Sequence, residues 1–343
     1  MHPGEHFHPS LLVILLSTGC ADSCPDGERR LPSSTEAVSC QSAGFARARP
    51  VDDGRIVRDS YSGTPPLIRS SRLTSVDRGG VGKDLSEGWS LNYAVGCTHG
   101  CPFCYMGSIH RRFGPSRFGE AVKGRWGSYL LTPCNIDELL ERTPWSRWKG
   151  KEVMLSSSHD PYLPEIAGTT RKILEKALDA GVRFCVQTRS VLVSRDIDIL
   201  KEHSDQVRVQ MSIATMDDRL AAAIEPRVPS PKARIGALAE LKSSGIRVGV
   251  IVAPVFPPVP MRLDVGEDLR DIAEALSSVE PERIFGESLH RRGSNIALSS
   301  AGIGSALRWS PDFDARAGEM FMAALAEHGL RGEWWGSDMG SHK

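Results

Sequence analysis

Three cysteines at C-x3-C-x2-C spacing constrain this chain more than any other feature of its sequence. Cys97, Cys101 and Cys104 lie in the stretch LNYAVGCTHGCPFCYMG. Thiolates are the ligands of iron–sulfur clusters, and at this spacing three of them can converge on one metal centre. A [4Fe–4S] cubane needs four ligands, so three cysteines leave one iron open to a substrate or cofactor. The motif therefore predicts a reactive cluster rather than a purely structural metal site.

A structural zinc site is the alternative for the same three cysteines. Structural zinc requires four closed ligands, and the remaining candidates Cys134 and Cys185 do not form a second paired knuckle. His99 lies between the first two cysteines, where it either ligates a metal or, more commonly, packs and forms hydrogen bonds. The residue pattern therefore favours the iron–sulfur cluster.

The same stretch resembles the signature of the radical S-adenosylmethionine (SAM) enzymes, in which an aromatic residue precedes the third cysteine. Phe103 holds that place here, and Tyr105 follows the cysteine. The resemblance implies that the open iron chelates the amino and carboxylate groups of SAM. It also implies that one electron cleaves SAM to a 5′-deoxyadenosyl radical. Phe103 and Tyr105 are therefore candidate cofactor-binding residues, and we expect a reducing partner of the flavodoxin or ferredoxin type.

Charge and cysteine usage indicate the environment of such a cluster. Lys and Arg together number 42, as do Asp and Glu, so no global field draws the protein to nucleic acid or to a membrane. Eight cysteines in 343 residues do not make a disulfide framework, and a low-potential cluster requires a reducing compartment. We therefore expect a cytoplasmic protein that does not bind membranes.

Residues 1–45 show no sustained periodicity and are expected to form a disordered leader. Their apolar run, Leu11–Leu16, is too short to span a bilayer and lacks the basic flank of a signal peptide. Cys20 and Cys24 repeat the first spacing of the motif, but no third cysteine follows at the required distance. With Cys40 they make at most a weak metal site.

Strand and helix signals alternate from Trp89 onward, after a polar, Gly- and Pro-containing lead-in over residues 46–85 that we expect to be extended with little regular structure. Apolar runs predict strands at 91–95, 153–155, 182–187, 207–213 and 246–252. Capping residues predict helix starts at Asn135, at Thr169 or Thr170, at Ser194 and at Ser230, and apolar periodicity predicts helices over 269–276 and 311–328.

This alternation, at intervals of roughly 30 residues, predicts βαβ units in a parallel sheet. About six units fit, so the predicted fold class is α/β, an open partial (β/α)6 TIM-type barrel. We assign the core domain to residues 86–290 and a small C-terminal extension to residues 291–343. Functional groups are expected at the C-terminal ends of the strands.

Three further stretches resemble the spore photoproduct lyase family, a DNA repair photolyase-like group of radical SAM enzymes. They read SSSHDPYLPEI, then RKILEKALDAGVRFCVQTRSVLVSRDIDIL, then VQMSIATMDDRLAAAIEPRVPSPKARIGALAELKSSGIRVGVIVAPVFP. The likeness covers about residues 85–260. It implies a partial TIM barrel, a [4Fe–4S] cluster and SAM as cofactor.

Polar residues after the second and third predicted strands are candidate cofactor ligands. Ser157, Ser158 and Asp160 follow the second strand, where they either hold the ammonium group of SAM or form a turn capped by its own hydroxyls. Arg189 and Ser190 follow the third strand, and a guanidinium group there suits a carboxylate. The family usually has Lys-Ser at this place, and the alternative for Arg189 is a surface salt bridge.

The fourth and fifth strands supply further candidates. Ser212 ends the fourth strand, and Glu225 and Arg227 follow in the next loop. Either Glu225 or Arg227 contacts the ribose of SAM, or the two fix the loop as an ion pair. Val250–Pro254 matches the apolar strand that flanks the adenine in the family.

Ser157 is a departure from the family pattern. Spore photoproduct lyases carry a cysteine in the turn after the second strand, which donates a hydrogen atom to the product radical. The matching residue here is Ser157, whose O–H bond is too strong to replace a thiol. The departure argues against repair of spore photoproduct itself and leaves the substrate open.

The segment 111–151 is locally basic, with nine Lys or Arg against four Asp or Glu, an excess of five. Aromatic residues are interleaved with these cations: Phe113, Phe118, Trp126, Tyr129, Trp145 and Trp148. Cations beside aromatic platforms suit unstacked nucleic acid. The alternative is a solvated surface over buried tryptophans.

Together these features predict a radical SAM enzyme that abstracts hydrogen from its substrate, with a damaged or modified nucleobase as the first candidate. One alternative is a radical SAM enzyme acting on a peptide or small molecule. The other is a non-enzymatic metal-binding module that uses the cysteines structurally.

Overall fold

A computed structural model describes residues 56–71 and 85–336 of the chain; the expectations for residues 1–45, including Cys20, Cys24 and Cys40, lie outside these ranges. The largest element is an eight-stranded sheet in the order β11-β10-β9-β8-β7-β6-β3-β2. Its neighbouring strands pair in parallel except β2 and β3, which are antiparallel. Neighbours in space are mostly successive strands of the chain, which is the arrangement that βαβ units produce.

Six successive parallel strands form the curved core of this sheet. They are β3 (Trp89–Leu91), β6 (Glu152–Leu155), β7 (Arg183–Thr188), β8 (Val207–Ser212), β9 (Arg247–Val255) and β10 (Arg283–Ser288). The edges are β2 (Ile68–Ser70) and β11 (Glu333–Trp334). The prediction of a partial (β/α)6 barrel is therefore confirmed.

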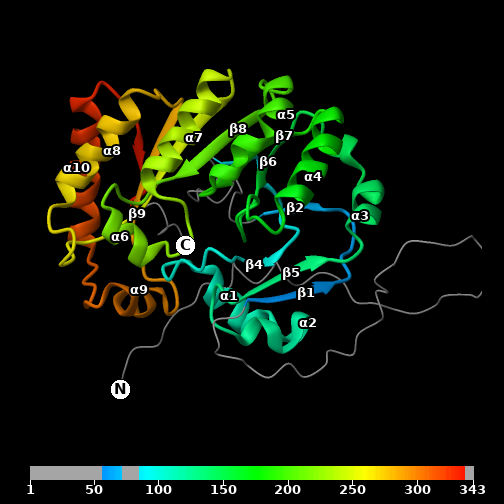
Figure 1. Cartoon of the computed structure of the whole chain (residues 1–343), viewed down its shortest axis with the longest axis horizontal. Helices are drawn as coiled ribbons and strands as arrows, with labels where there is room; N and C mark the ends of the chain where they lie inside the picture. Colours follow the sequence, from blue (N-terminus) through cyan, green and yellow to red (C-terminus); the bar gives the residue numbers. More distant parts are fainter. Residues whose placement is uncertain (1–55, 72–84, 337–343) are drawn as a thin grey trace, which may run out of the picture.

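Helices line the outside of the curved sheet (Figure 1). They are α4 (Ala167–Asp179), α5 (Ile197–Glu202), α7 (Pro231–Ser243), α8 (Val265–Ser277) and α10 (Pro311–Glu327). Shorter helical segments occupy the connections: α1 (Met106–Phe113), α2 (Pro115–Phe118), η4 (Gly119–Lys123), α3 (Ile136–Arg142), η5 (Trp145–Trp148), η6 (Val191–Asp196), α6 (Asp218–Ile224) and α9 (Asn295–Ile303). None of the helices in the described ranges combines the length and apolar character needed to cross a membrane.

The strands are buried on both faces, which explains why they read as continuous apolar runs. Val209 and Met211 of β8 belong to the main hydrophobic core together with side chains of the outer helices. The alternate positions point into the barrel, where Met154, Cys185 and Phe285 form a separate apolar cluster. Because successive side chains of a strand point to opposite faces, this parity identifies the inward-facing residues at the strand ends.

Local capping signals located some helix starts correctly and others incorrectly. The Ser230 hydroxyl accepts a hydrogen bond from the Ala233 N–H at 3.3 Å, so α7 begins where the sequence predicts. In contrast, α4 begins before Thr170, because the Thr170 hydroxyl is buried and lies 2.6 Å from the Tyr93 hydroxyl. The Thr170 hydroxyl, which the sequence offered as a cap for the start of α4, therefore contacts Tyr93 instead. Ser194 likewise lies inside η6, and α5 begins after it.

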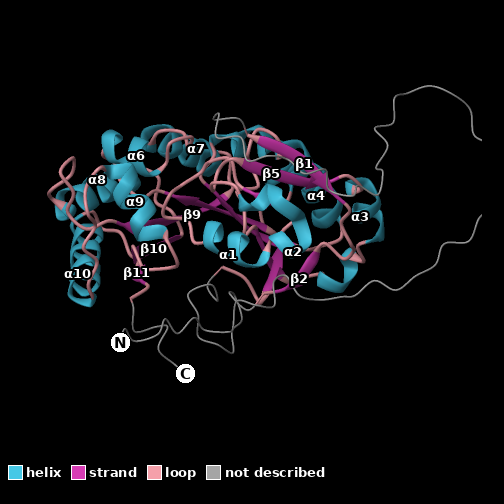
Figure 2. Ribbon diagram, turned by 90° about the horizontal axis from the view of Figure 1, so that it is seen from below, coloured by secondary structure: helices cyan, strands magenta, loops and turns pink. Residues whose placement is uncertain are grey.

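The segment expected to be an extended lead-in contains two strands. β1 (Val57–Tyr61) pairs in parallel with β5 (Tyr129–Pro133), which also pairs with β4 (Val95–Gly96) in a small second sheet. β1 and β5 run side by side (Figure 2). Most residues of β1 are exposed, so its sequence lacks the alternation by which a half-buried strand is recognised.

Gly286 allows β11 to close over β10, and its replacement tests this packing. A Cβ at Gly286 would lie 2.6 Å from the indole ring of Trp334. We expect Gly286→Ala to destabilise the fold by about 1–3 kcal/mol, measured as the shift of the urea unfolding midpoint. Gly236→Ala is the matched control, because that helical glycine has open space around it and should gain about 0.5–1 kcal/mol. Equal midpoints for both variants would contradict the contact.

Candidate active site

The three motif cysteines share the loop between β4 and α1. Cys97 and Cys101 are buried, Cys104 is partly buried, and all three carry free thiols. Cys101 and Phe103 pack into a hydrophobic cluster with side chains of α6 and α9. The loop is therefore held by the fold and presents three thiols from a single short segment.

The loop environment fits a cationic metal cluster. Burial raises the pKa of the Cys97 thiol to about 12 and that of Cys101 well above its usual range. Burial likewise raises the pKa of Cys104. Because a thiol must ionise to bind metal, three buried thiols are compensated best by the positive charge of a metal centre.

Within residues 56–71 and 85–336, no group of three or more His, Cys, Asp or Glu side chains is placed to hold one metal ion. Zinc thiolates converge to about 2.3 Å from a single ion, whereas a cubane is ligated at separate corners.

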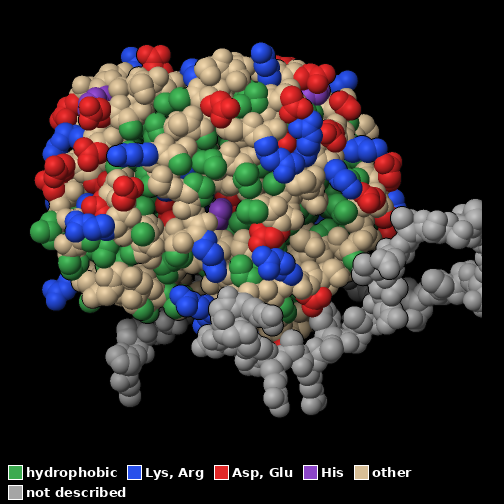
Figure 3. All heavy atoms as spheres, in the orientation of Figure 1, with side chains coloured by type: hydrophobic (Ala, Val, Ile, Leu, Met, Phe, Trp, Pro, Cys, Tyr) green, Lys and Arg blue, Asp and Glu red, His purple; other side chains and the backbone are tan. Residues whose placement is uncertain are grey.

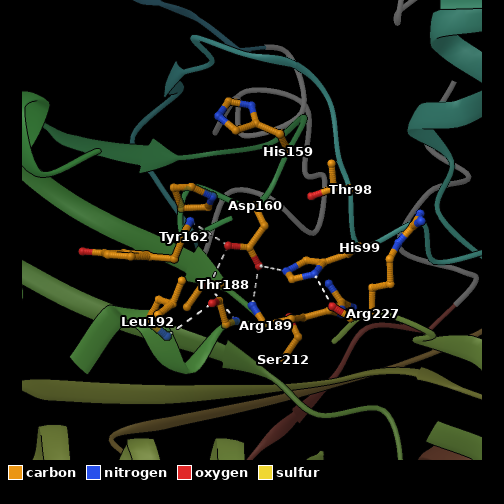
Figure 4. A network of polar contacts seen from close by, with 12 residues as sticks. Thr98, His99, His159, Asp160, Tyr162, Thr188, Arg189, Leu192, Ser212 and Arg227 are labelled. Atoms are coloured by element: carbon orange, nitrogen blue, oxygen red, sulfur yellow. Dashed lines mark hydrogen bonds and ion pairs between the residues drawn. The ribbon is translucent and has the colours of Figure 1, made fainter. Parts of the chain in front are cut away.

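The Asp160 carboxylate connects the cysteine loop to the strand ends (Figure 4). Its Oδ2 lies 3.1 Å from His99 Nε2 and accepts the Arg189 N–H at 2.6 Å. Its Oδ1 accepts the Thr188 hydroxyl at 2.7 Å and the Tyr162 N–H at 2.8 Å. Burial alone would raise the pKa of Asp160, but the charge of His99 and these hydrogen bonds outweigh it and lower the pKa.

Asp160 therefore has a positioning role that the sequence did not reveal. Its two oxygens are occupied by four protein groups from the cysteine loop, the turn after β6 and the end of β7. Whether Asp160 also reaches the ammonium group of SAM stays a prediction. Through these contacts Asp160 connects the cysteine loop to the ends of β6 and β7.

His99 and Arg227 fasten the loop from its other side. His99 Nδ1 lies 3.0 Å from the Arg227 carbonyl, and the Arg227 guanidinium donates to the Gly127 carbonyl at 2.7 Å. A Cβ at Gly100, whose φ is +65°, would lie 2.5 Å from that guanidinium. Both ring nitrogens of His99 thus contact protein groups, which agrees with the expectation of a hydrogen-bonded residue rather than a metal ligand. Arg227 holds the cysteine loop against Gly127.

Arg189 joins the third strand end to the residues after the fourth. Its Nε donates to Glu225 at 2.9 Å, and its Nη2 donates to the Ala253 carbonyl at 3.1 Å. Its guanidinium carbon also lies 5.3 Å from the centre of the Phe103 ring. Arg189 is therefore no isolated surface ion pair, because it spans the barrel mouth from β7 to β9.

Glu225 and Ser212 meet through a second arginine that the sequence analysis missed. Arg234 of α7 is fully buried and donates to Glu225 and, at 2.6 Å, to the Ser212 carbonyl. An arginine on an amphipathic helix resembles any solvated residue in sequence, so no local signal marked it. Glu225 bridges two arginines, Arg189 and Arg234, and among the described residues it forms no ion pair with Arg227.

The serines after the strands divide into two groups. Ser157 accepts a hydrogen bond from the Asn92 amide at 2.9 Å, and its carbonyl accepts from the Tyr105 hydroxyl at 3.3 Å. Ser158 and Ser190 act locally: Ser158 Oγ lies 3.1 Å from the His159 ring, and Ser190 caps η6. The capped-turn alternative therefore describes the hydroxyl of Ser158, and the Ser190 hydroxyl is used as a helix cap.

An unpartnered amide lies on the inner face of β7. Gln187 shares the parity of Cys185, and its buried Nε2 has no hydrogen-bond partner among the described residues. A buried amide without a partner is costly, so a ligand acceptor inside the barrel mouth would satisfy it. Cys185 itself lies deeper in the barrel and bonds to Arg208.

A second polar group missed from the sequence lies at the C-terminal end of β10. Glu287 is partly exposed there, and it forms ion pairs with His290 and Arg292. Arg292 also lies over the Tyr105 ring, 5.8 Å from its centre. No strand was predicted over β10, because its Arg, Gly and Glu residues break the apolar run that marks the other strands.

Five of the six aromatic rings named for the basic segment are buried: Phe118, Trp126, Tyr129, Trp145 and Trp148. Phe113 is partly exposed, and the Arg112 guanidinium carbon lies 5.1 Å from the centre of its ring. Basic and acidic side chains are interspersed over the face shown in Figure 3. The interpretation as stacking surfaces was wrong for the five buried rings, because their apolar bodies fill the core beneath exposed cations.

Asp160→Asn tests the connection described above. An amide group turns one acceptor into a donor that faces other donors, so at least two bonds to a charged group are lost. At about 1.5–3 kcal/mol each, we expect a loss of about 3–5 kcal/mol in the free energy of urea unfolding. Asp271→Asn, an exposed change on α8, should alter it by less than about 0.5 kcal/mol. Similar small effects for both would refute the role of Asp160.

Comparisons with known proteins agree with this geometry. The family model described as "Radical SAM superfamily" matches residues 91–273, more than half of the chain. Uncharacterized protein ORF301 of Acidianus two-tailed virus is 52% identical over 80% of this chain and 91% of its own length. The radical SAM Nα-GlyT isomerase of Pseudomonas phage M6 is 27% identical over 54% of this chain and 36% of its own.

A solved structure has the same fold. Spore photoproduct lyase complexed with dinucleoside spore photoproduct aligns with a TM-score of 0.59, covering 84% of this chain and 87% of the lyase. The two sequences are 13% identical over the alignment. The likeness therefore concerns the fold alone.

Proposed function

This chain belongs to the radical SAM superfamily, and we propose that it binds a [4Fe–4S] cluster and SAM and abstracts hydrogen from a nucleic-acid substrate. It is a radical SAM enzyme. The non-enzymatic metal-binding alternative is therefore dropped. The observation that carries the proposal is the loop of three free thiols at the mouth of a parallel barrel.

Cys97, Cys101 and Cys104 would hold the cluster, and the fourth iron would stay open to SAM. When bound, this pair of cofactors supplies one electron and a carbon-centred radical able to abstract hydrogen. The chain needs an external reductant for this chemistry, and we propose a flavodoxin- or ferredoxin-type partner in the cytoplasm. The core unit would be residues 86–290, and residues 291–343 its extension.

The strand ends would orient SAM around that open iron. Phe103 and Tyr105 flank the third thiol, each beneath an arginine. Arg189, neutralised by Glu225, would present its remaining N–H groups toward the methionine carboxylate. These contacts orient groups before the reaction, which is how a protein contributes to the chemistry of its cofactor.

Further polar groups extend the same site. Gln187 would donate its unpartnered amide to the cofactor. Ser158, Ser190 and Ser212 line the strand ends, and we propose that their backbone groups border the cofactor. Their placement is supported by the hydrogen bonds that hold each turn in place.

The nucleic-acid proposal is supported by the names of similar proteins and by exposed cations. The lyase of the same fold is complexed with a dinucleoside lesion, and the phage relative is an isomerase of Nα-GlyT. Arg111 and Arg125 are exposed, on α1 and after η4. A peptide or small-molecule substrate is the rival, and it would leave these cations without a phosphate to bind.

Loss of one cysteine tests the cluster. Replacing Cys97, Cys101 or Cys104 by Ala should remove the iron and abolish formation of 5′-deoxyadenosine from SAM, because no fourth thiol in the loop replaces the missing ligand. The measurement is iron content and product formation after anaerobic reconstitution with dithionite. Cys185→Ala is the control and should keep both, because Cys185 lies inside the barrel. Iron retained in Cys101→Ala would sink the assignment.

Ser157 tests the kind of reaction. It stands where the lyases carry their donor thiol, so the wild-type enzyme should not repair spore photoproduct cleanly. Ser157→Cys introduces an S–H group beside Asn92 and Tyr105. If the enzyme is otherwise a photoproduct lyase, this variant should give clean repair where the wild type gives mixed adducts. The products are separated by chromatography, with Ser157→Ala as the matched control. Clean repair by the wild type, unchanged in Ser157→Cys, would place the donor elsewhere.

A further inference from the structure

A buried ion pair joins the loop after β9 to helix α8. Arg262 lies in that loop and Asp268 lies on the helix, and Arg262 Nε is 3.5 Å from Asp268 Oδ2. The two side chains are 6% and 8% exposed. Charged side chains are rarely buried to this extent unless they are paired, so the pair needs an explanation.

Stability does not explain the pair. Arg262 Nε and Nη1 form no hydrogen bond within the described residues. Burial lowers the pKa of Arg262 and raises that of Asp268, so the surroundings disfavour each charge. A buried pair with incomplete hydrogen bonding adds little stability compared with apolar residues of similar size. The role of the pair therefore follows from the groups that it holds in place.

Arg262 holds the loop after β9. Its Nη2 donates to the Phe256 carbonyl at 2.8 Å, and its backbone exchanges hydrogen bonds of 2.9 and 3.0 Å with Val259. The Phe256 ring lies edge-on to the Phe103 ring, with centroids 6.0 Å apart and an interplanar angle of 72°. Both rings belong to the apolar cluster that contains Cys101. Arg262 thus holds the residue that supports Phe103 of the cysteine loop.

Asp268 holds the connection between β8 and α6. Its carboxylate accepts the Thr215 hydroxyl at 2.8 Å and the Met216 N–H at 2.8 Å. The Thr215 hydroxyl oxygen accepts the Asp217 N–H at 3.1 Å, and Asp217 caps α6 by accepting the Leu220 N–H at 2.8 Å. Leu220 belongs to the same apolar cluster as the two phenylalanine rings. The ion pair therefore anchors two walls of the cluster that surrounds the cysteine loop.

Arg189 connects these walls to the cofactor site. Its guanidinium carbon lies 5.3 Å from the centre of the Phe103 ring, and its Nη2 donates to the Ala253 carbonyl of β9 at 3.1 Å. The end of β9 and the loop after it thus support both Phe103 and Arg189, which the proposed function assigns to SAM. A displacement of Phe256 would shift the ring beside the third thiol without removing any of the three thiols.

We propose that Arg262 and Asp268 are positioning residues for SAM binding, because the pair sets the Phe256 ring against Phe103. The inference rests on the proposed function and adds two residues that lie outside the cysteine loop. Under it, uptake of the cluster depends on the thiols, whereas the affinity for SAM depends also on how the loop after β9 is held.

The test is SAM binding to the anaerobically reconstituted enzyme, measured by equilibrium dialysis together with iron content and the thermal midpoint. Arg262→Met alone leaves Asp268 as an unpaired buried charge and should lower the midpoint by about 10 °C. The double variant Arg262→Met with Asp268→Asn removes both charges and keeps an acceptor for the Met216 N–H. Its midpoint should return to within about 3 °C of wild type. It still lacks the donor to the Phe256 carbonyl, so its SAM affinity should be about tenfold weaker at unchanged iron content.

Two controls separate positioning from stability. Leu325 lies on α10 against Gly332, in the outer layer of the fold (Figure 1). Leu325→Ala should lower the thermal midpoint by about 10 °C and bind SAM as wild type does. Phe256→Leu should weaken SAM binding about tenfold. Adding it to the double variant should weaken binding no further, because both changes act on one ring contact.

The failures are distinguishable. If the double variant recovers its thermal midpoint and binds SAM as tightly as wild type, the inference is overturned and the proposed function stands. Additive losses in the triple variant would also overturn it, since the pair would then act by another route. If the double variant does not fold, unchanged SAM binding by Phe256→Leu overturns the inference. A wild-type enzyme that takes up no iron and binds no SAM would instead refute the proposed function.

Discussion

The arrangement of the site depends on one buried carboxylate, Asp160, and on the donors that surround it. A buried charge is tolerated only when its hydrogen-bonding capacity is filled. Here the donors come from the cysteine loop, the turn after β6 and the end of β7. Because Asp160 must keep these donors, its hydrogen bonds hold the cysteine loop at a set distance from the ends of β6 and β7. A cofactor would lie between the thiols and these strand ends.

The same rule organises the rest of the barrel mouth. Glu225 is buried and satisfied by Arg189 and Arg234, which join β7, α7 and the loop after α6. Arg227 uses its carbonyl and its guanidinium to hold His99 and Gly127 together. Paired buried charges of this kind specify a unique geometry more than they add stability. Contacts within the protein thus hold the mouth in place without a ligand, which reduces the ordering cost of binding.

Some buried polar atoms of the described residues have no hydrogen-bond partner, among them Gln187 Nε2 and Arg234 Nε. Gln187 lies at an inward-facing position near the end of β7. A buried donor without a partner is costly, and a cofactor or a substrate at the barrel mouth would satisfy this one.

The sequence by itself determined the cluster motif, the fold class and the alternation of strands with helices, because these depend on local spacing and on apolar runs. It also identified the strand-end residues from Ser157 to Glu225. Only the tertiary structure decided what those side chains contact. Thr170 could cap a helix but bonds Tyr93, and the aromatic residues of the basic segment are buried. Arg234 acquires its role from Ser212 and Glu225, which lie on other elements, and local patterns carry no record of such contacts.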